Sequence, residues 1–339
     1  THNMTICGKA VAEILHGRPV RYSYMNGGSG GGRQSLAEAQ FYPNDYDGIW
    51  ASCPAINWTQ FLASGLWAVT VMNEYDHILG FHKINAFRDA VHNSVGGKEN
   101  YFQVEERIDF DPYTILGQKT KGGKITEKDC LVMQEIWKGP HTTGNDFLWY
   151  SFLPGGTFWN KIIPIGSFYY PLIGKRPKCF SLVEQYVHLA FEDPKKDLLH
   201  LKIRDFEKVF DTCIRKLGWL SCDHADLRPF ANAGGKLIID HGLDDPLIPV
   251  EGTIDYYHHM REIHGGQNFI DRFCRLYINP GDGHGNCHTN GPGMTESTGI
   301  QALMNWVEHN KAPENLPAVL VNQKTGKTIR KGIVKPWRV

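Results

Sequence analysis

The spacing of apolar residues divides the first part of the chain into four predicted elements. Residues 1–20 read as a helix, because four apolar residues recur on one helical face: Ala10, Val11, Ile14 and Leu15. The alternating, aromatic-rich run Arg21–Met25 predicts a strand, residues 31–42 predict a helix, and Asp47–Pro54 predicts a short buried strand. Strand, helix and strand in close succession imply a parallel pair joined by a crossover helix.

The same rhythm returns after residue 233. The predicted elements there are strand, helix, strand and helix, at Gly234–Gly242, Glu251–Ile263, Phe269–Ile278 and Thr298–Asn310. Two short extended runs close the chain, Ala318–Val321 and Thr328–Ile333, and we expect both to lie along the surface.

The middle of the chain has a different character. It is rich in aromatic residues, most of which we expect in an ordinary core, and its helical patches at Glu127–Trp137 and Leu198–Leu217 lie between glycine and proline loops. No repeat of strand and helix is visible. We therefore predict an α/β core formed by residues 1–56 and 228–339, with residues 57–227 inserted as a lid domain.

Composition excludes several classes of function. Lys plus Arg (36) balances Asp plus Glu (36), so no bulk charge favours nucleic acid or an acidic membrane. No apolar run is long enough to span a bilayer. The eight cysteines include no C-x-x-C pair, which argues against a zinc site of the usual spacing. We expect no nucleic-acid partner, no membrane span, no metal and no cofactor.

One candidate for chemistry lies between the first predicted strand and the helix after it. Residues Gly27–Gly31 fit G-x-S-x-G, the sharp turn that lifts a nucleophilic serine out of a sheet. Glycine suits such a turn because the backbone is strained and closely approached. Ser29 would be the nucleophile, and the backbone N–H of Gly30 would meet a developing oxyanion at a helix N-terminus. A plain glycine-rich linker is the alternative.

Two further loops supply the partners that such a serine needs. Asp245 and His284 each follow a predicted strand, and the carboxyl ends of parallel strands meet at one edge of a sheet. Ser–Asp–His is the chain order of α/β-hydrolases. His284 would take the proton of Ser29 and Asp245 would orient the imidazole. Asp244 and His288 are the alternatives; Asp245 as a turn cap and His284 as an ordinary loop residue are the structural interpretations.

The chain resembles the tannase and feruloyl esterase family of serine esterases, which includes enzymes acting on terephthalate esters. The resemblance rests on RYSYMNGGSGGGRQSLAEAQ and its continuation to residue 55, on residues 234–257, and on residues 275–293 with 302–313. It implies an α/β-hydrolase core with a lid, and hydrolysis of esters of aromatic acids through an acyl-enzyme without a cofactor. It also implies secretion, although the cysteine losses described next would suit a reducing compartment.

The departures from the family concern the surroundings of the site. The family pattern has a disulfide between the residue before the nucleophile and the residue after the histidine, where this chain has Gly28 and Gly285. A calcium loop in the lid corresponds to residues 89–97 here, which keep only the carboxylate of Asp89, so we expect no calcium.

The nucleophile also lies close to the start of the sequence. The family places several strands, and the loop with the second oxyanion donor, upstream of this elbow. We therefore expect a fragment, a processed chain or a truncated product, with an unpaired strand edge unless another segment or chain completes the sheet.

Three hypotheses follow for the function. The first is a tannase- or feruloyl-esterase-like carboxylesterase acting on a small aromatic ester. The second is a catalytically impaired member that acts as a binding or structural remnant, which the losses at the site favour. The third is an α/β-hydrolase of unrelated specificity.

Overall fold

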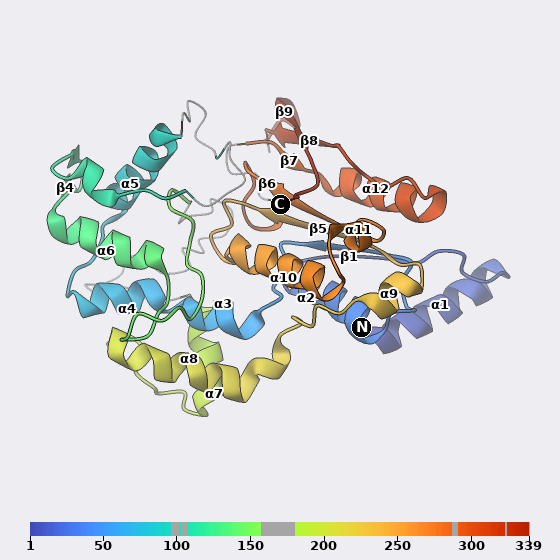
Figure 1. Cartoon of the computed structure of the whole chain (residues 1–339), viewed down its shortest axis with the longest axis horizontal. Helices are drawn as coiled ribbons and strands as arrows, with labels where there is room; N and C mark the ends of the chain where they lie inside the picture. The colour runs from blue at the N-terminus through green and yellow to red at the C-terminus, as the bar shows by residue number, and fades with distance from the viewer. Residues whose placement is uncertain (96–101, 103–107, 157–179, 287–290, 323, 339) are drawn as a thin grey trace.

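The computed structural model describes the chain except residues 96–101, 103–107, 157–179, 287–290, 323 and 339 (Figure 1). Its centre is a four-stranded parallel sheet in the order β1-β2-β5-β6. The strands are β1 (Tyr24–Gly28), β2 (Gly48–Ser52), β5 (Lys236–Gly242) and β6 (Cys274–Asn279). The predicted parallel pair is therefore present, and the rear strands extend the same sheet.

Helices cover both faces of this sheet. Helices α2 (Gly30–Phe41) and α10 (Val250–Ile263) pack on one face, and α12 (Glu296–His309) packs on the other. Three further helices lie at the periphery: α1 (His2–His16), α9 (Arg228–Asn232) and α11 (Gln267–Ile270). Trp50 and Ile238 point to the α12 side, where Trp306 packs, while Ile49 and Leu237 point into the larger core. Burial on both faces explains why β2 and β5 read as nearly continuous apolar runs.

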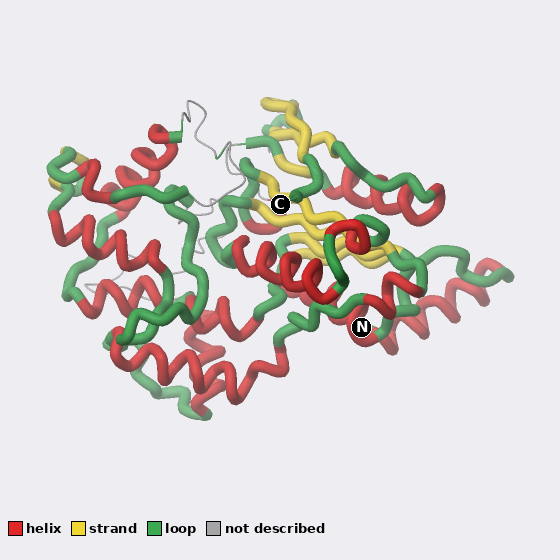
Figure 2. Tube along the Cα trace, in the orientation of Figure 1, coloured by secondary structure: helices red, strands yellow, loops and turns green. Residues whose placement is uncertain are grey.

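A separate group of helices lies to one side of the sheet, at the left of Figures 1 and 2. It comprises α3 (Trp58–Ser64), α4 (Trp67–Glu74), α5 (Phe81–Ser94), α6 (Glu127–Lys138), α7 (Ser181–Phe191) and α8 (Ile203–Leu217). Short elements complete it: η1 (Pro112–Ile115), β3 (Lys119–Thr120), β4 (Gly123–Lys124) and η2 (Gly218–Leu220). The lid boundary at residues 57 and 227 stays a prediction.

The structure corrects two expected element boundaries and the placement of the closing runs. The strand expected from Phe269 begins at Cys274, because residues 267–270 form the short helix α11. The helix expected from Leu198 begins at Ile203. Finally, the closing runs do more than lie along the surface. The strands β7 (Gly293–Met294), β8 (Leu316–Val321) and β9 (Thr328–Val334) pair as an antiparallel sheet.

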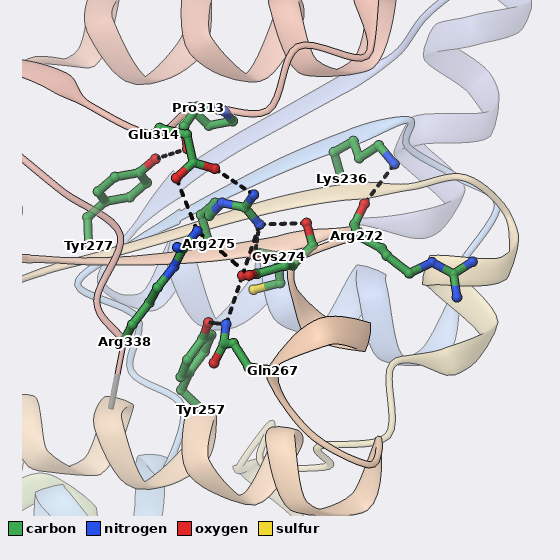
Figure 3. A network of polar contacts seen from close by, with 11 residues as sticks. Lys236, Tyr257, Gln267, Arg272, Cys274, Arg275, Tyr277, Pro313, Glu314 and Arg338 are labelled. Carbon is green, nitrogen blue, oxygen red and sulfur yellow. Dashed lines mark hydrogen bonds and ion pairs between the residues drawn. The ribbon is translucent and has the colours of Figure 1, made fainter.

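The end of the chain covers the β6 edge of the main sheet. Trp337 N–H donates to Leu276 O (2.7 Å), and Tyr277 pairs with Pro336. Figure 3 shows the polar network beside this contact. Arg275, whose side chain is only 5% exposed, donates to Glu314 Oε1 (3.0 Å) and to the backbone oxygen of Asp271 (2.6 Å). Because the edge is covered, β6 offers few free backbone groups to another chain.

The β1 edge differs, because no strand pairs with it among the described residues. Helix α1 contacts the segment before β2 through polar groups. His2 Nδ1 lies 2.6 Å from Asp45 Oδ2, and Thr5 Oγ1 lies 2.5 Å from the Tyr46 hydroxyl. Its apolar side faces outward, with Ile14 80% and Leu15 76% exposed. Such an arrangement inverts the usual amphipathic pattern of a surface helix.

None of the described helices combines the length and the apolar character that crossing a membrane requires.

Candidate active site

Ser29 occupies a strained turn between β1 and α2. Its φ of 59° and ψ of −120° lie where non-glycine residues are rare, and its N–H donates to Ser52 O (2.9 Å) in the next strand. The glycine requirement has a steric cause. A Cβ on Gly27 would lie 2.3 Å from Gly31 O, and one on Gly32 would lie 2.8 Å from Ser52 O and from Pro54 Cα. A Cβ on Gly31 would meet nothing, so the motif glycine at 31 is less constrained than its neighbour.

Asp245 sits in the loop that follows β5 and is held by backbone donors. Its Oδ1 accepts from the N–H groups of Leu247 (2.8 Å) and Ile248 (2.9 Å). Its Oδ2 accepts from Nδ1 of His284 (2.7 Å). The carboxylate is therefore both the cap of a tight turn and the partner of a histidine, so the turn-cap and functional interpretations hold together.

His284 comes from the loop after β6 and joins the other two residues. Its Nε2 lies 2.9 Å from Ser29 Oγ, so the serine hydroxyl can donate to it while Nδ1–H donates to Asp245. The structure thus brings Ser29, His284 and Asp245 into one hydrogen-bonded chain. Close backbone packing positions the histidine loop: a Cβ on Gly242 would lie 2.4 Å from Asp282 O and Gly283 O.

The contacts within this hydrogen-bonded triad change the pKa values of Asp245 and His284. Burial raises the pKa of Asp245, but the charge of His284 and hydrogen bonds from His241 and His284 outweigh it, so the pKa lies well below its usual value. Burial lowers the pKa of His284, but the charge of Asp245 and its hydrogen bond outweigh that effect and hold the pKa well above the usual value. Each member of the pair therefore stabilises the charged form of the other.

Sequence reasoning missed two residues next to this chain. His241, at the end of β5, has its Nε2 3.1 Å from Asp245 Oδ2. Cys53, in the loop after β2, brings its thiol close to His284 and Asp245. Neither carries a motif of its own; the only signal is that each follows or ends a buried strand at the edge where Asp245 lies.

The remaining predicted positions are placed as follows. Gly30 is the first residue of α2, so its N–H stays outside the intrahelical hydrogen bonds. Gly285 has a left-handed φ of 65°. His288 lies outside the described residues, and Asp244 is buried in the loop before Asp245. Of the stretch compared with a calcium loop, residues 89–94 form the end of α5, and residues 96–97 are outside the description.

Two groups of described residues bring three possible metal ligands within 4.8 Å of one another: Cys53, Asp245 and His284, and His2, Glu38 and Asp45. In both groups a histidine already pairs with an aspartate, at 2.7 and 2.6 Å. These pairs account for the histidine and the aspartate of each group.

A parallel sheet with a nucleophile elbow after β1, an aspartate after β5 and a histidine after β6 is the arrangement of the α/β-hydrolase class. Residues 1–146 and 175–337 match the family model for tannase and feruloyl esterase. The chain therefore belongs to the tannase and feruloyl esterase family, which confirms the resemblance inferred from its motifs.

Individual relatives agree with this assignment. A probable feruloyl esterase of Arthroderma benhamiae is 32% identical over 337 residues, which cover 94% of this chain and 60% of the relative. The mono(2-hydroxyethyl) terephthalate hydrolase of Piscinibacter sakaiensis is 26% identical, over 93% of this chain and 60% of the relative. Across these relatives the chain spans about 60% of their length.

Solved structures show the same fold. Feruloyl esterase B from Aspergillus oryzae aligns with a TM-score of 0.81 at 19% identity, over 99% of this chain and 68% of that one. Tannin acyl hydrolase from Aspergillus niger aligns with a TM-score of 0.80 at 23% identity, over 99% and 65%.

Proposed function

We propose that this protein is a serine carboxylesterase that cleaves esters of aromatic acids through an acyl-enzyme. The observation that carries the proposal is the hydrogen-bonded chain from Ser29 Oγ through His284 to Asp245, with distances of 2.9 and 2.7 Å. Nucleophile, base and orienting acid within hydrogen-bond reach form the arrangement that serine hydrolysis requires.

In this proposal each residue has one role. Ser29 Oγ attacks the ester carbonyl while its proton passes to His284 Nε2, which then protonates the leaving alcohol. A water molecule then attacks the acyl carbon while its proton passes to His284 Nε2. The bond to Ser29 Oγ breaks, Ser29 recovers a proton from His284, and the acid is released. Asp245 keeps the Nδ1–H tautomer of His284 and stabilises the imidazolium. The N–H of Gly30, at the positive end of α2, donates to the oxyanion.

Family membership supports an aromatic substrate. One relative is named as a probable feruloyl esterase and another as a mono(2-hydroxyethyl) terephthalate hydrolase. Beside the loop that carries Asp245, a cavity of about 10 Å³ is lined by apolar and aromatic side chains, among them Phe61, Leu62 and Tyr150. It has room for about one water molecule, so the proposed substrate class rests on the family alone.

The second candidate is an impaired member of the family, and a specific observation favours it. Gly28 and Gly285 stand where the family pattern has a disulfide, and neither residue can form one. A native disulfide can contribute about 2–4 kcal/mol. Among the residues that the structure describes, the 2.9 Å hydrogen bond and the packing of the loops hold Ser29 beside His284.

A fluorophosphonate probe distinguishes the two candidates. It should label the wild-type chain at Ser29 and leave the Ser29→Ala variant unlabelled. Labelling that is equal in both proteins, or absent from both, would remove the esterase proposal for this polypeptide. Turnover of methyl ferulate against methyl gallate then identifies the preferred acid, with Ser29→Ala as the blank.

We also propose that a further segment or a second chain completes the sheet beside β1. The support is the β1 edge, unpaired among the described residues, together with the outward apolar side of α1, where Ile14 and Leu15 are exposed. Light scattering of the chain, with an Ile14→Glu/Leu15→Glu variant as control, measures this. A wild-type chain that stays monomeric and as soluble as the variant contradicts it.

Secretion is the localisation that we propose, on family resemblance. The six described free cysteines are instead what a reducing compartment permits. Cell fractionation of the native protein decides between the two.

A further inference from the structure

A second histidine contacts the acid of the candidate site. His241 is fully buried at the end of β5, between the sheet and α10. Its Nε2 lies 3.1 Å from Asp245 Oδ2, the same oxygen that accepts from His284. Its Nδ1 lies 2.8 Å from the Thr253 hydroxyl, on the first turn of α10. Both ring nitrogens therefore have a partner.

These contacts determine the tautomer of the buried ring. An ionised carboxylate only accepts hydrogen bonds, so His241 Nε2 carries the proton that points to Asp245. In the neutral ring, Nδ1 must then accept, and Thr253 Oγ1 is the donor. A hydroxyl from α10 thus orients a histidine from β5, which in turn donates to the acid in the next loop.

We propose that His241 is a positioning residue: by donating to Asp245 Oδ2 it holds the carboxylate and limits the negative charge that Asp245 presents to His284. The proposal rests on the esterase function put forward above. Two imidazoles share one oxygen, while the backbone donors at Leu247 and Ile248 occupy the other. All accepting positions of the carboxylate are therefore used, and its rotation is blocked.

The consequence concerns the working pH of the base. His284 can take a proton only while it is neutral, and Asp245 favours its charged form. A second donor on Asp245 weakens that effect. Loss of the donor should therefore make His284 more basic and move the acid limb of the activity profile to higher pH. Among the described residues, the titratable groups close by include Cys53, Asp240, Asp244 and Asp282, which every variant below leaves in place.

Three variants separate positioning from packing. His241→Leu removes the donor at similar size, and His241→Gln keeps an N–H that can reach Asp245. Thr253→Val keeps the shape of its side chain but removes the hydroxyl that orients the ring. We expect the midpoint of the acid limb in the pH profile of kcat/KM to move to higher pH by about one unit in His241→Leu. The shift should be smaller in Thr253→Val, and in His241→Gln the midpoint should return towards that of the wild type.

A readout without turnover keeps this test distinct from that of the esterase function. The pKa of His284 can be followed by NMR of histidine-labelled protein, with His284→Gln to assign the signal. A raised His284 pKa in His241→Leu and Thr253→Val supports the inference even if the wild type hydrolyses no ester, in which case the proposed function fails alone. An unchanged His284 pKa in folded variants overturns it, as does an equal shift in His241→Gln and His241→Leu. Should His241→Leu not fold, Thr253→Val decides.

Discussion

Gly242 is the point where the sheet touches the histidine loop, and a single added methyl group should disturb catalysis there. A Cβ at this position would lie 2.4 Å from both Asp282 O and Gly283 O, whereas ordinary contact begins near 3.4 Å. Since both atoms belong to backbone, no side chain can rotate away. In Gly242→Ala the loop must therefore move by about 1 Å.

That movement acts directly on the hydrogen bond between His284 and Ser29. The Nε2–Oγ distance of 2.9 Å would lengthen beyond hydrogen-bond reach. A displacement of about 1 Å can cost about 10²-fold in rate, and overpacking costs roughly 1–3 kcal/mol of stability. We expect kcat/KM for an aromatic ester to fall about 10²-fold in a protein that still folds.

The assay compares ester hydrolysis, fluorophosphonate labelling rate and thermal unfolding in wild type and variant. Gly28→Ala is the matched control, because it also adds a methyl group at the end of a strand but meets only Ser52 O at 3.9 Å. If Gly242→Ala retains the kcat/KM and the labelling rate of the wild type, the loop is not held by this contact and the reasoning is wrong.

Two further predictions concern stability. Burial raises the pKa of Asp240 to about 7, despite hydrogen bonds from Trp50 and Ser52 that lower it. Between about pH 4 and 7 the unfolded chain loses this proton while the folded protein keeps it, so stability should fall by at most about 4 kcal/mol as pH rises. Urea midpoints across that range should decline less in Asp240→Asn, and an identical decline would contradict the assignment. Glu314→Gln removes one of the two carboxylates that pair with the buried Arg275, the other being Asp271, and should cost about 1–3 kcal/mol. Arg338→Gln breaks half-exposed pairs with Glu314 and Asp271 and should cost less than about 1 kcal/mol. Equal unfolding midpoints for the two variants would show that burial of Arg275 does not matter.

Local patterns were sufficient for the parts of this protein whose cause is local. The elbow could be predicted because its need for glycine is local: a side chain at Gly27 would clash with Gly31 O, four residues along the chain. The order Ser29, Asp245, His284 could be predicted because each residue follows a strand, and parallel strands end at one edge. The buried strands β2 and β5 were recognisable from their apolar runs.

Contacts between distant segments decided the rest. That His241 shares an oxygen with His284 depends on β5, α10 and the loop after β6 meeting at one point, and no spacing in the sequence encodes it. The sequence predicted two extended runs near the end of the chain, but only the tertiary structure shows that they form β8 and β9 of one sheet with β7. Likewise, the apolar stripe of α1 predicted a helix correctly, but only the tertiary structure shows that the stripe faces outward, because periodicity reports a face and not what covers it.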